Sequence, residues 1–182
     1  MTTEPLAIAP DSTEFAPYYG KYTSLVKSDN IIATLETQAQ RSRAAYQSLT
    51  EEQSNFRYAP DKWNIRQMLG HIIDAERIFS YRALRIARGD KTPIEGFEQD
   101  DYVRNAPFER CTMAELLDEF AVVRRATVLL FRSLSADAWT RRGIASNNEV
   151  SVRALAYIIA GHELHHMAVL NEKYLPALKT SR

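Results

Sequence analysis

The residues best suited to chemistry in this sequence are its four histidines. His71 stands alone, whereas His162, His165 and His166 fall close together near the end of the chain. Histidines four positions apart lie on one face of an α-helix, about one turn apart, and can reach the same divalent ion. His162 and His166 have this spacing. The pattern therefore indicates a candidate metal site, provided that the segment is helical.

The apolar residues around these histidines decide which of them face the core. Taken at about 100° per residue, an arc of core-facing positions is defined by Leu155, Ile158, Ile159, His162, Val169 and Leu170. His166 lies near the centre of this arc, whereas His165 falls nearly a quarter of a turn outside it. We expect His165 to point along the rim and exclude it from the ligand set. His71, the remaining histidine, is the expected third ligand from another helix.

Three imidazoles leave at least one coordination position for water or substrate, as in catalytic rather than purely structural sites. An ion held in this way, with Zn²⁺ or Ni²⁺ expected, lowers the pKa of a bound water or thiol. The alternative is that the histidines are core or rim residues whose partners are carboxylates and backbone groups. The spacing alone does not separate the two interpretations.

Other polar and aromatic residues carry weaker signals. Glu76 faces the apolar side of its segment, so it needs a partner: most commonly an arginine, otherwise a histidine or a metal-linked water. Asp74 and Glu163 project away from the apolar arcs and are expected to be solvated, and Cys111 receives no role. Aromatic residues that could line a pocket, but are more typical of a core, are Tyr18, Tyr19, Tyr22, Trp63, Phe79 and Tyr81.

Four amphipathic helices are expected to position these side chains. The first covers about residues 29–49. The second starts at the capping box Asn64-Ile65-Arg66-Gln67 and ends at Gly89. The third follows the capping box formed by Thr112 and Glu115, and the fourth runs from Ser151 to about residue 174, before Pro176 stops it.

The segments between these helices differ in what they predict. Residues 89–111 contain prolines and aromatics and predict a long ordered connection or lid, whose aromatic side chains could cover a bound substrate. Residues 141–148 predict a polar connection, and no strand is expected anywhere. Residues 1–16 carry two prolines and predict a flexible arm, followed by one bundle domain over residues 17–182.

Composition excludes several classes of function. The 23 basic residues balance the 23 acidic ones, which disfavours a nucleic-acid partner. Charged residues interrupt every apolar segment, so no run reaches the roughly 18 apolar residues of a membrane span. The single cysteine cannot form an internal disulfide, and the first residues lack the features of a signal peptide. We therefore expect a cytoplasmic protein.

Three stretches carry a resemblance to a known family. The run KWNIRQMLGHIIDAER at residues 62–77 resembles the first signature of the DinB/YfiT-like family, with Asn64 in place of the usual serine cap. YRALRIARGD at 81–90 and AGHELHH at 160–166 are similar to its continuation and its C-terminal signature. The resemblance implies an all-α four-helix bundle with a long connection between helices two and three. It also implies one metal ion at His71, His162 and His166, and frequent homodimers.

The resemblance implies a broad range of chemistry. Members of the family include transferases that use low-molecular-weight thiols such as bacillithiol or mycothiol, and isomerases of thiol adducts. We expect a metal-dependent transferase or hydrolase that acts on a small molecule, in which the ion activates a thiol or a water. The alternative is a non-catalytic metal-binding protein that serves in stress response or dimerisation. DNA binding conflicts with the neutral charge.

Overall fold

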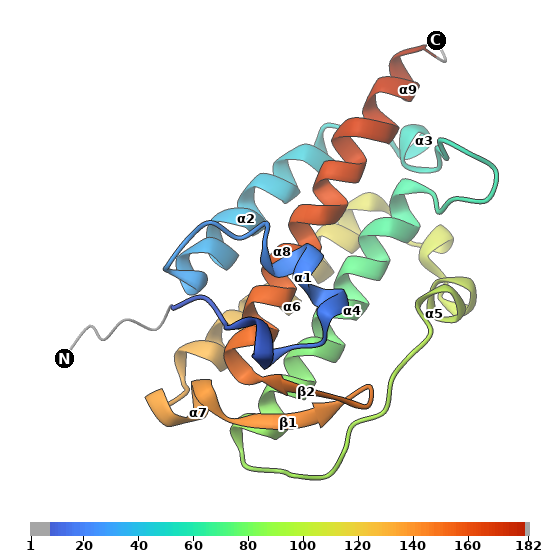
Figure 1. The fold of residues 1–182 in the computed structure, drawn as a ribbon. Helices are drawn as coiled ribbons and strands as arrows, with labels where there is room; N and C mark the ends of the chain where they lie inside the picture. The colour runs from blue at the N-terminus through green and yellow to red at the C-terminus, as the bar shows by residue number, and fades with distance from the viewer. Residues whose placement is uncertain (1–7, 181–182) are drawn as a thin grey trace.

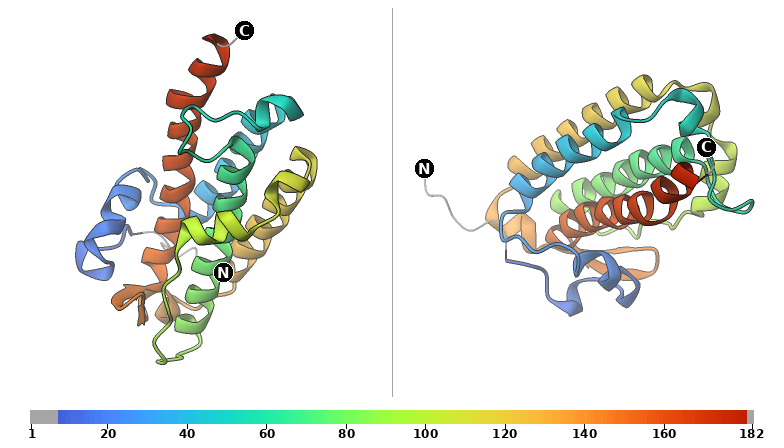
Figure 2. Two further views of the ribbon diagram at one scale, coloured as in Figure 1. Left: turned by 90° about the vertical axis from the view of Figure 1, so that its right-hand side faces the viewer. Right: turned by 90° about the horizontal axis from the view of Figure 1, so that it is seen from above.

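Four long helices form the body of the computed structural model, which describes residues 8–180 (Figure 1). They are α2 (Ile31–Gln47), α4 (Ile65–Ala87), α6 (Met113–Arg132) and α8 (Val152–Val169). Helix α2 packs against α6 and α8, and α4 also packs against α6 and α8, so that each long helix has two long neighbours (Figure 2). The arrangement confirms the expected all-α four-helix bundle.

The local signals at the helix ends act as expected. The side chain of Asn64 accepts a hydrogen bond from the backbone N–H of Gln67, and the Gln67 side chain accepts one from Asn64, which closes a capping box at the start of α4. Gly89 lies two positions after the last residue of α4 and has a φ of +80°, a conformation that glycine adopts without steric cost. Thr112 caps α6 and Ser151 caps α8.

A β-hairpin replaces the polar connection predicted over residues 141–148. Strands β1 (Arg142–Ala145) and β2 (Asn148–Ser151) pair antiparallel, and the expectation that the chain contains no strand is therefore wrong. Ser146 and Asn147, between the strands, have φ values of +49° and +62°. A two-residue hairpin loop of this kind requires a left-handed conformation at both positions. Residue 94 of the long connection adds a parallel bridge to Ala145.

The last long helix continues beyond Pro176, where it was predicted to stop. Helix α8 passes through a π-helical turn, η4 (Leu170–Tyr174), into α9 (Leu175–Thr180). Proline has no N–H to donate and disturbs the regular hydrogen-bond ladder of a helix. In the turn before it, the N–H of Leu175 donates to the carbonyl of Leu170, five residues back. The wider π-helical turn accommodates the disturbed hydrogen-bond pattern near Pro176, so the helix continues without a break.

Short elements connect the long helices and flank them. The connection over residues 89–111 contains α5 (Gln99–Asn105) and η3 (Phe108–Arg110) and no long helix. The remaining short elements are η1 (Ser12–Glu14), η2 (Pro17–Tyr19), α1 (Gly20–Thr23), α3 (Glu51–Ser54) and α7 (Ala136–Thr140). Helix α1 packs against α8.

The N-terminal segment contacts the start of α8. Of the expected flexible arm, residues 1–7 lie outside the described residues. In the described remainder, Glu14 of η1 is buried and accepts hydrogen bonds from Ser151 Oγ and Arg153 Nε, both at 2.7 Å. Since a buried carboxylate needs such partners, these contacts hold the segment against the bundle.

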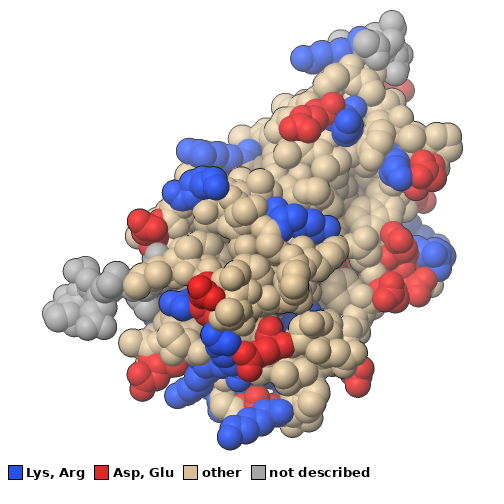
Figure 3. Space-filling model, in the orientation of Figure 1, with Lys and Arg blue, Asp and Glu red and all other residues tan. Residues whose placement is uncertain are grey.

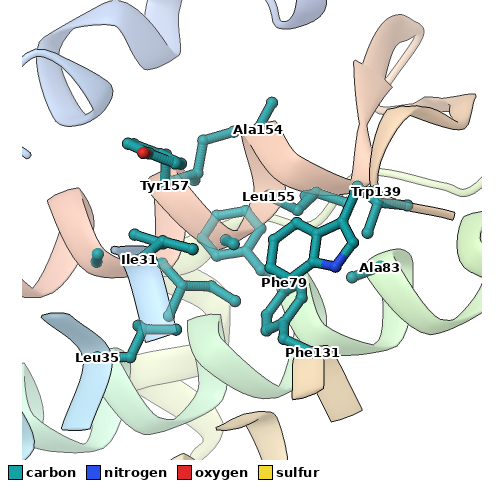
Figure 4. Close-up of a cluster of buried hydrophobic side chains, with 14 of the residues drawn as sticks. Ile31, Leu35, Phe79, Ala83, Phe131, Trp139, Ala154, Leu155 and Tyr157 are labelled. Carbon is teal, nitrogen blue, oxygen red and sulfur yellow. The ribbon is translucent and has the colours of Figure 1, made fainter. Parts of the chain in front are cut away.

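Buried apolar side chains from all four long helices form two clusters inside the bundle. Figure 4 shows the first, in which Phe79 of α4, Phe131 of α6 and Leu155 of α8 lie together beside Trp139 of α7. The second cluster is built around Met68, Leu69 and Phe120. Burial of this apolar surface is the main favourable contribution to folding. Along α4, His71 lies among residues of the second cluster, between Leu69 and Ile72, and the first cluster begins at Ala75, so buried apolar residues flank the candidate site on both sides along the helix.

The surface shows no separation of charge on the face drawn in Figure 3, where basic and acidic side chains are interspersed. Among the described residues, no helix is both long enough and apolar enough to cross a membrane.

Candidate metal centre

Helices α4 and α8 bring three of the four histidines together in the bundle interior. His162 Nε2 lies 3.0 Å from His71 Nε2 and 3.1 Å from His166 Nε2. One ring nitrogen from each of the three residues falls within 4.8 Å of the others. A tetrahedral zinc ion with Zn–N bonds of about 2.0–2.1 Å holds its nitrogen ligands roughly 3.3 Å apart. The three imidazoles can therefore hold a divalent metal ion.

The surroundings of the three rings keep them neutral. Burial lowers the pKa of His71 to about 4. Burial also lowers the pKa of His162 and His166 far below the usual value, and the neighbouring histidines add to this effect. A neutral imidazole is the form that binds a metal, so no proton has to be removed near neutral pH before an ion can bind.

His165 lies outside this group, at the rim of the site. It is partly buried, and its ring packs against those of Tyr22 and His166, with centroids 5.4 Å and 5.1 Å away. It is not among the residues whose ligand atoms converge. The angle around the helix placed His166 toward the core and His165 at the rim, and in the structure only His166 of the two belongs to the converging group.

Aromatic rings pack directly against the candidate ligands. Tyr22 of α1 meets the ring of His162 edge-on, with centroids 5.2 Å apart, and Trp63 lies 4.7 Å from the ring of His71. The centroid of Phe79 lies 6.0 Å from that of His162. These contacts restrict the rotation of the imidazoles and cover them from solvent, so that the ligand atoms are held in place before any ion binds.

A cavity of about 300 Å³ opens beside His71 and His162. Four of the aromatic residues considered from the sequence line it: Tyr18, Tyr19, Tyr22 and Phe79. Tyr81 is instead 52% exposed and is absent from the lining. The long connection contributes Phe97, Glu98, Gln99 and Asp100, and the hairpin turn contributes Ser146. Of residues 89–111, the part that lines the cavity is therefore 97–100, with one aromatic side chain, Phe97, among them. A larger groove of about 510 Å³ lies between α2 and α6, away from the three histidines.

The carboxylates near the site behave differently from one another. Glu76 pairs with Arg124 through two hydrogen bonds of 2.8 Å, which is the arginine partner expected for it. Glu163 was expected to be solvated, and this is wrong: it is 1% exposed, accepts from Ser42 Oγ at 2.5 Å and lies 2.8 Å from Arg124. The cause is that both α2 and α4 pack against α8, so residues outside one apolar arc are buried as well. Asp74 is half-buried.

Sequence reasoning missed two residues beside the cavity, Arg82 and Ser146. Arg82 is 2% exposed and donates to the Glu95 carbonyl at 3.1 Å and to Ser146 Oγ at 2.9 Å. A signal for Arg82 existed, because it follows Phe79 by three positions and so lies on the apolar face of its helix. Glu76, which precedes Phe79 by three positions, was recognised by the same argument. Ser146 carried no such signal, because the hairpin that positions it was not expected.

Comparison with known proteins places the chain in a family. Residues 34–170 match the profile of the DinB superfamily. A protein from Oceanobacillus iheyensis, named "Putative metal-dependent hydrolase OB0413", is 28% identical over 139 residues, which cover 74% of this chain and 78% of the relative. A protein from Bacillus pumilus named "Putative metal-dependent hydrolase" is 24% identical over 136 residues, 73% of this chain and 77% of the relative.

Solved structures share the fold. YfiT from Bacillus subtilis, described as a probable metal-dependent hydrolase with an unusual four-helix bundle topology, superposes with a TM-score of 0.73 at 17% identity and covers 87% of this chain and 91% of its own. A DinB-like protein from the same organism, YjoA, gives a TM-score of 0.57 at 14% identity, over 84% and 92% of the two chains. At this identity the likeness concerns the fold alone. With the family match over residues 34–170, it follows that this chain belongs to the DinB superfamily.

Proposed function

We propose that this protein is a metal-dependent enzyme that hydrolyses a small molecule, with one divalent ion held by His71, His162 and His166. The observation that carries the proposal is that two buried imidazoles, His71 and His162, and the partly buried imidazole of His166 converge, with His162 Nε2 facing the Nε2 atoms of both others. Neutral imidazole has one N–H donor and one acceptor nitrogen. His162 Nε2 faces two other ring nitrogens but carries either one proton or one lone pair, so it cannot form a good hydrogen bond to both. A shared cation satisfies all three lone pairs.

The chain's own residues would prepare this site for chemistry. Burial keeps the three rings neutral, Tyr22 and Trp63 hold two of them in orientation, and the cavity beside His71 and His162 gives a small molecule access. When bound, a divalent ion lowers the pKa of a bound water or thiol and so supplies a nucleophile near neutral pH. Zn²⁺ is the first expectation and Ni²⁺ the second, because imidazole ligands suit both ions.

Hydrolysis comes before thiol transfer in this proposal because the two sequence relatives carry the name of hydrolases. Transfer of a low-molecular-weight thiol would use the same centre with sulfur as the nucleophile. Assays of ester hydrolysis and of thiol addition on the same metal-loaded protein separate these reactions. Stoichiometric metal without either activity would instead support a non-catalytic metal-binding protein.

Metal content is the first experiment. The untagged protein and its variants His71→Ala, His162→Ala and His166→Ala are purified and analysed by inductively coupled plasma mass spectrometry. We expect about one ion per chain in the wild type and strong loss in each variant. His165→Ala is the matched control, because His165 is adjacent to the group but outside it, and it should keep its ion. A wild type that stays free of metal after reconstitution would contradict the proposal.

We also propose the homodimer that the family resemblance implies. Light scattering after size exclusion gives the mass in solution. A value near twice the 20.8 kDa of one chain supports the dimer, and a value near 20.8 kDa contradicts it.

A further inference from the structure

Arg82 is a buried charge that has no counter-ion in the described part of the chain. Its side chain is 2% exposed, and both of its hydrogen bonds use Nη2. Nε is buried without an acceptor, and within residues 8–180 no carboxylate forms an ion pair with the guanidinium. Buried charges in proteins are normally paired, because desolvation without compensation is costly. The neutral acceptors around Arg82 therefore leave its charge uncompensated.

The guanidinium lies directly behind one wall of the cavity. Its central carbon is 5.7 Å from the ring centroid of Phe79 and 5.9 Å from that of Phe97. Both rings line the cavity, and so does Ser146, whose Oγ accepts from Arg82. The aromatic contacts stabilise the cation but contribute no negative charge. The cavity that adjoins the candidate metal ligands thus has a buried positive charge beside it.

Ser146 connects this charge to the cavity. A serine hydroxyl can accept and donate at the same time. Its oxygen already accepts from Arg82 at 2.9 Å, and among the described residues its own proton has no acceptor. The positive charge of the guanidinium polarises the hydroxyl and makes that proton a stronger donor. An acceptor with negative charge inside the cavity would satisfy the hydroxyl and compensate Arg82 together.

We propose that the cavity selects substrates that carry an oxyanion, a carboxylate or a phosphate, with Ser146 as the group that binds it. Arg82 acts through Ser146 and is a positioning residue. Glu98 and Asp100 also line the cavity, but both are exposed, so solvent screens their charges far more than that of Arg82. The inference deepens the proposed function and rests on it for the reaction, because it names the class of substrate for the same site.

The test compares two probes of equal shape and different charge, benzoate and benzamide. Their ring suits the aromatic lining of the cavity, and only benzoate carries an oxyanion. Dissociation constants are measured by ligand-observed NMR on metal-loaded protein at constant ionic strength. We expect the wild type to bind benzoate at least fivefold more tightly than benzamide. In Ser146→Gly the ratio should fall to twofold or less.

Matched variants keep the test independent of folding. Ser146 and Asn147 are both left-handed residues of the same turn, so glycine suits both positions. Only Ser146 contacts Arg82, and Asn147→Gly should therefore keep the wild-type ratio. Arg82→Gln removes the charge and should lower the ratio as Ser146→Gly does, with circular dichroism to verify that each variant is folded.

Binding of benzoate to the metal itself is the main alternative. It would leave the ratio unchanged in Ser146→Gly and abolish it when a chelator removes the ion, and this result would overturn the inference. A wild type without any preference for benzoate would overturn it as well. If the ratio depends on Ser146 in a protein that holds no metal, the oxyanion site stands and the proposed metal-dependent function fails.

Discussion

The backbone of Tyr22 crosses helix α8 directly at Gly161. A Cβ atom placed on Gly161 would lie 2.1 Å from the carbonyl oxygen of Tyr22 and 2.4 Å from its carbonyl carbon. Real atoms do not approach so closely, so only glycine permits this contact. The position precedes His162, whose ring Tyr22 packs against. The absence of a side chain at residue 161 therefore determines how closely α1 covers the candidate metal centre.

Gly161→Ala should destabilise the protein and loosen the centre together. The added methyl group meets backbone, which cannot rotate away, so α1 must move; we expect a loss of about 2–3 kcal/mol in the free energy of unfolding. Displacement of Tyr22 frees the ring of His162, and metal affinity should fall about tenfold. Urea unfolding and metal titration measure the two effects. Gly20→Ala in α1 is the control, because a Cβ there meets nothing within 4 Å, and it should change neither.

A second glycine, Gly70, directly precedes His71 and is also closely covered. A Cβ on Gly70 would lie 2.5 Å from two ring atoms of Phe108, which packs over α4 from η3. Here the neighbour is a side chain, so the clash can be relieved by a smaller residue. Gly70→Ala should cost about 1–2 kcal/mol in the wild type and clearly less in a Phe108→Leu background. Equal costs in the two backgrounds, measured by urea unfolding, would mean that the ring is not the obstacle.

Signals that act within a few residues of the chain were sufficient for much of this fold. The capping boxes at Asn64 and Thr112 and the cap at Ser151 predicted where three of the long helices begin. Helical periodicity also separated His166 from His165, because the angle between two positions on one helix is fixed by its geometry. Both kinds of signal are local, and neither depends on what the neighbouring helices do.

Features that depend on contacts between distant segments could not be predicted in the same way. Glu163 is buried where α2 packs against α8, and its hydrogen-bond partner there, Ser42, is 121 positions away in the chain. The hairpin was missed because its turn is formed by Ser146 and Asn147 rather than by a glycine pair, and its strands are short. The approach of Tyr22 to His162 depends on Gly161, whose role becomes visible only when α1 is placed on α8.

Arg124 joins carboxylates of α4 and α8 inside the bundle, so its removal should be costly. It bonds Glu76 through two hydrogen bonds, lies 2.8 Å from Glu163 and donates to the carbonyl of Leu35 at 2.8 Å. Arg124→Met leaves two buried carboxylates without their cation, and we expect a loss of about 3–5 kcal/mol in the free energy of unfolding.

The control for Arg124 is a partly exposed arginine with the same kind of partner. Arg43 pairs with Asp118 at 3.0 Å on the surface. Since exposed ion pairs contribute little, Arg43→Met should cost less than about 1 kcal/mol. Both variants are compared by urea unfolding at neutral pH. Similar losses in the two would show that the buried network contributes no more than a surface pair.

Glu14 should make stability depend on pH in the acidic range. Burial by itself raises the pKa of its carboxyl group, but hydrogen bonds from Arg153, Ser151 and the backbone of Asp11 outweigh this and lower the pKa to about 2. A carboxyl group with a lowered pKa in the folded state stabilises the protein above its unfolded pKa of 4.5. This contribution is lost progressively as the pH falls from about 4.5 to about 2.

Glu14→Gln should therefore remove stability at neutral pH and little at low pH. We expect the variant to be about 2–3 kcal/mol less stable than the wild type at pH 6–7, with a difference that shrinks below pH 4.5. Urea unfolding at a series of pH values measures it. Arg153→Gln removes the main partner and should produce a loss over the same pH range. A difference between wild type and Glu14→Gln that stays constant from pH 7 to pH 3 would show that the carboxylate is not held by these hydrogen bonds, and that the N-terminal segment is attached to α8 by its apolar contacts instead.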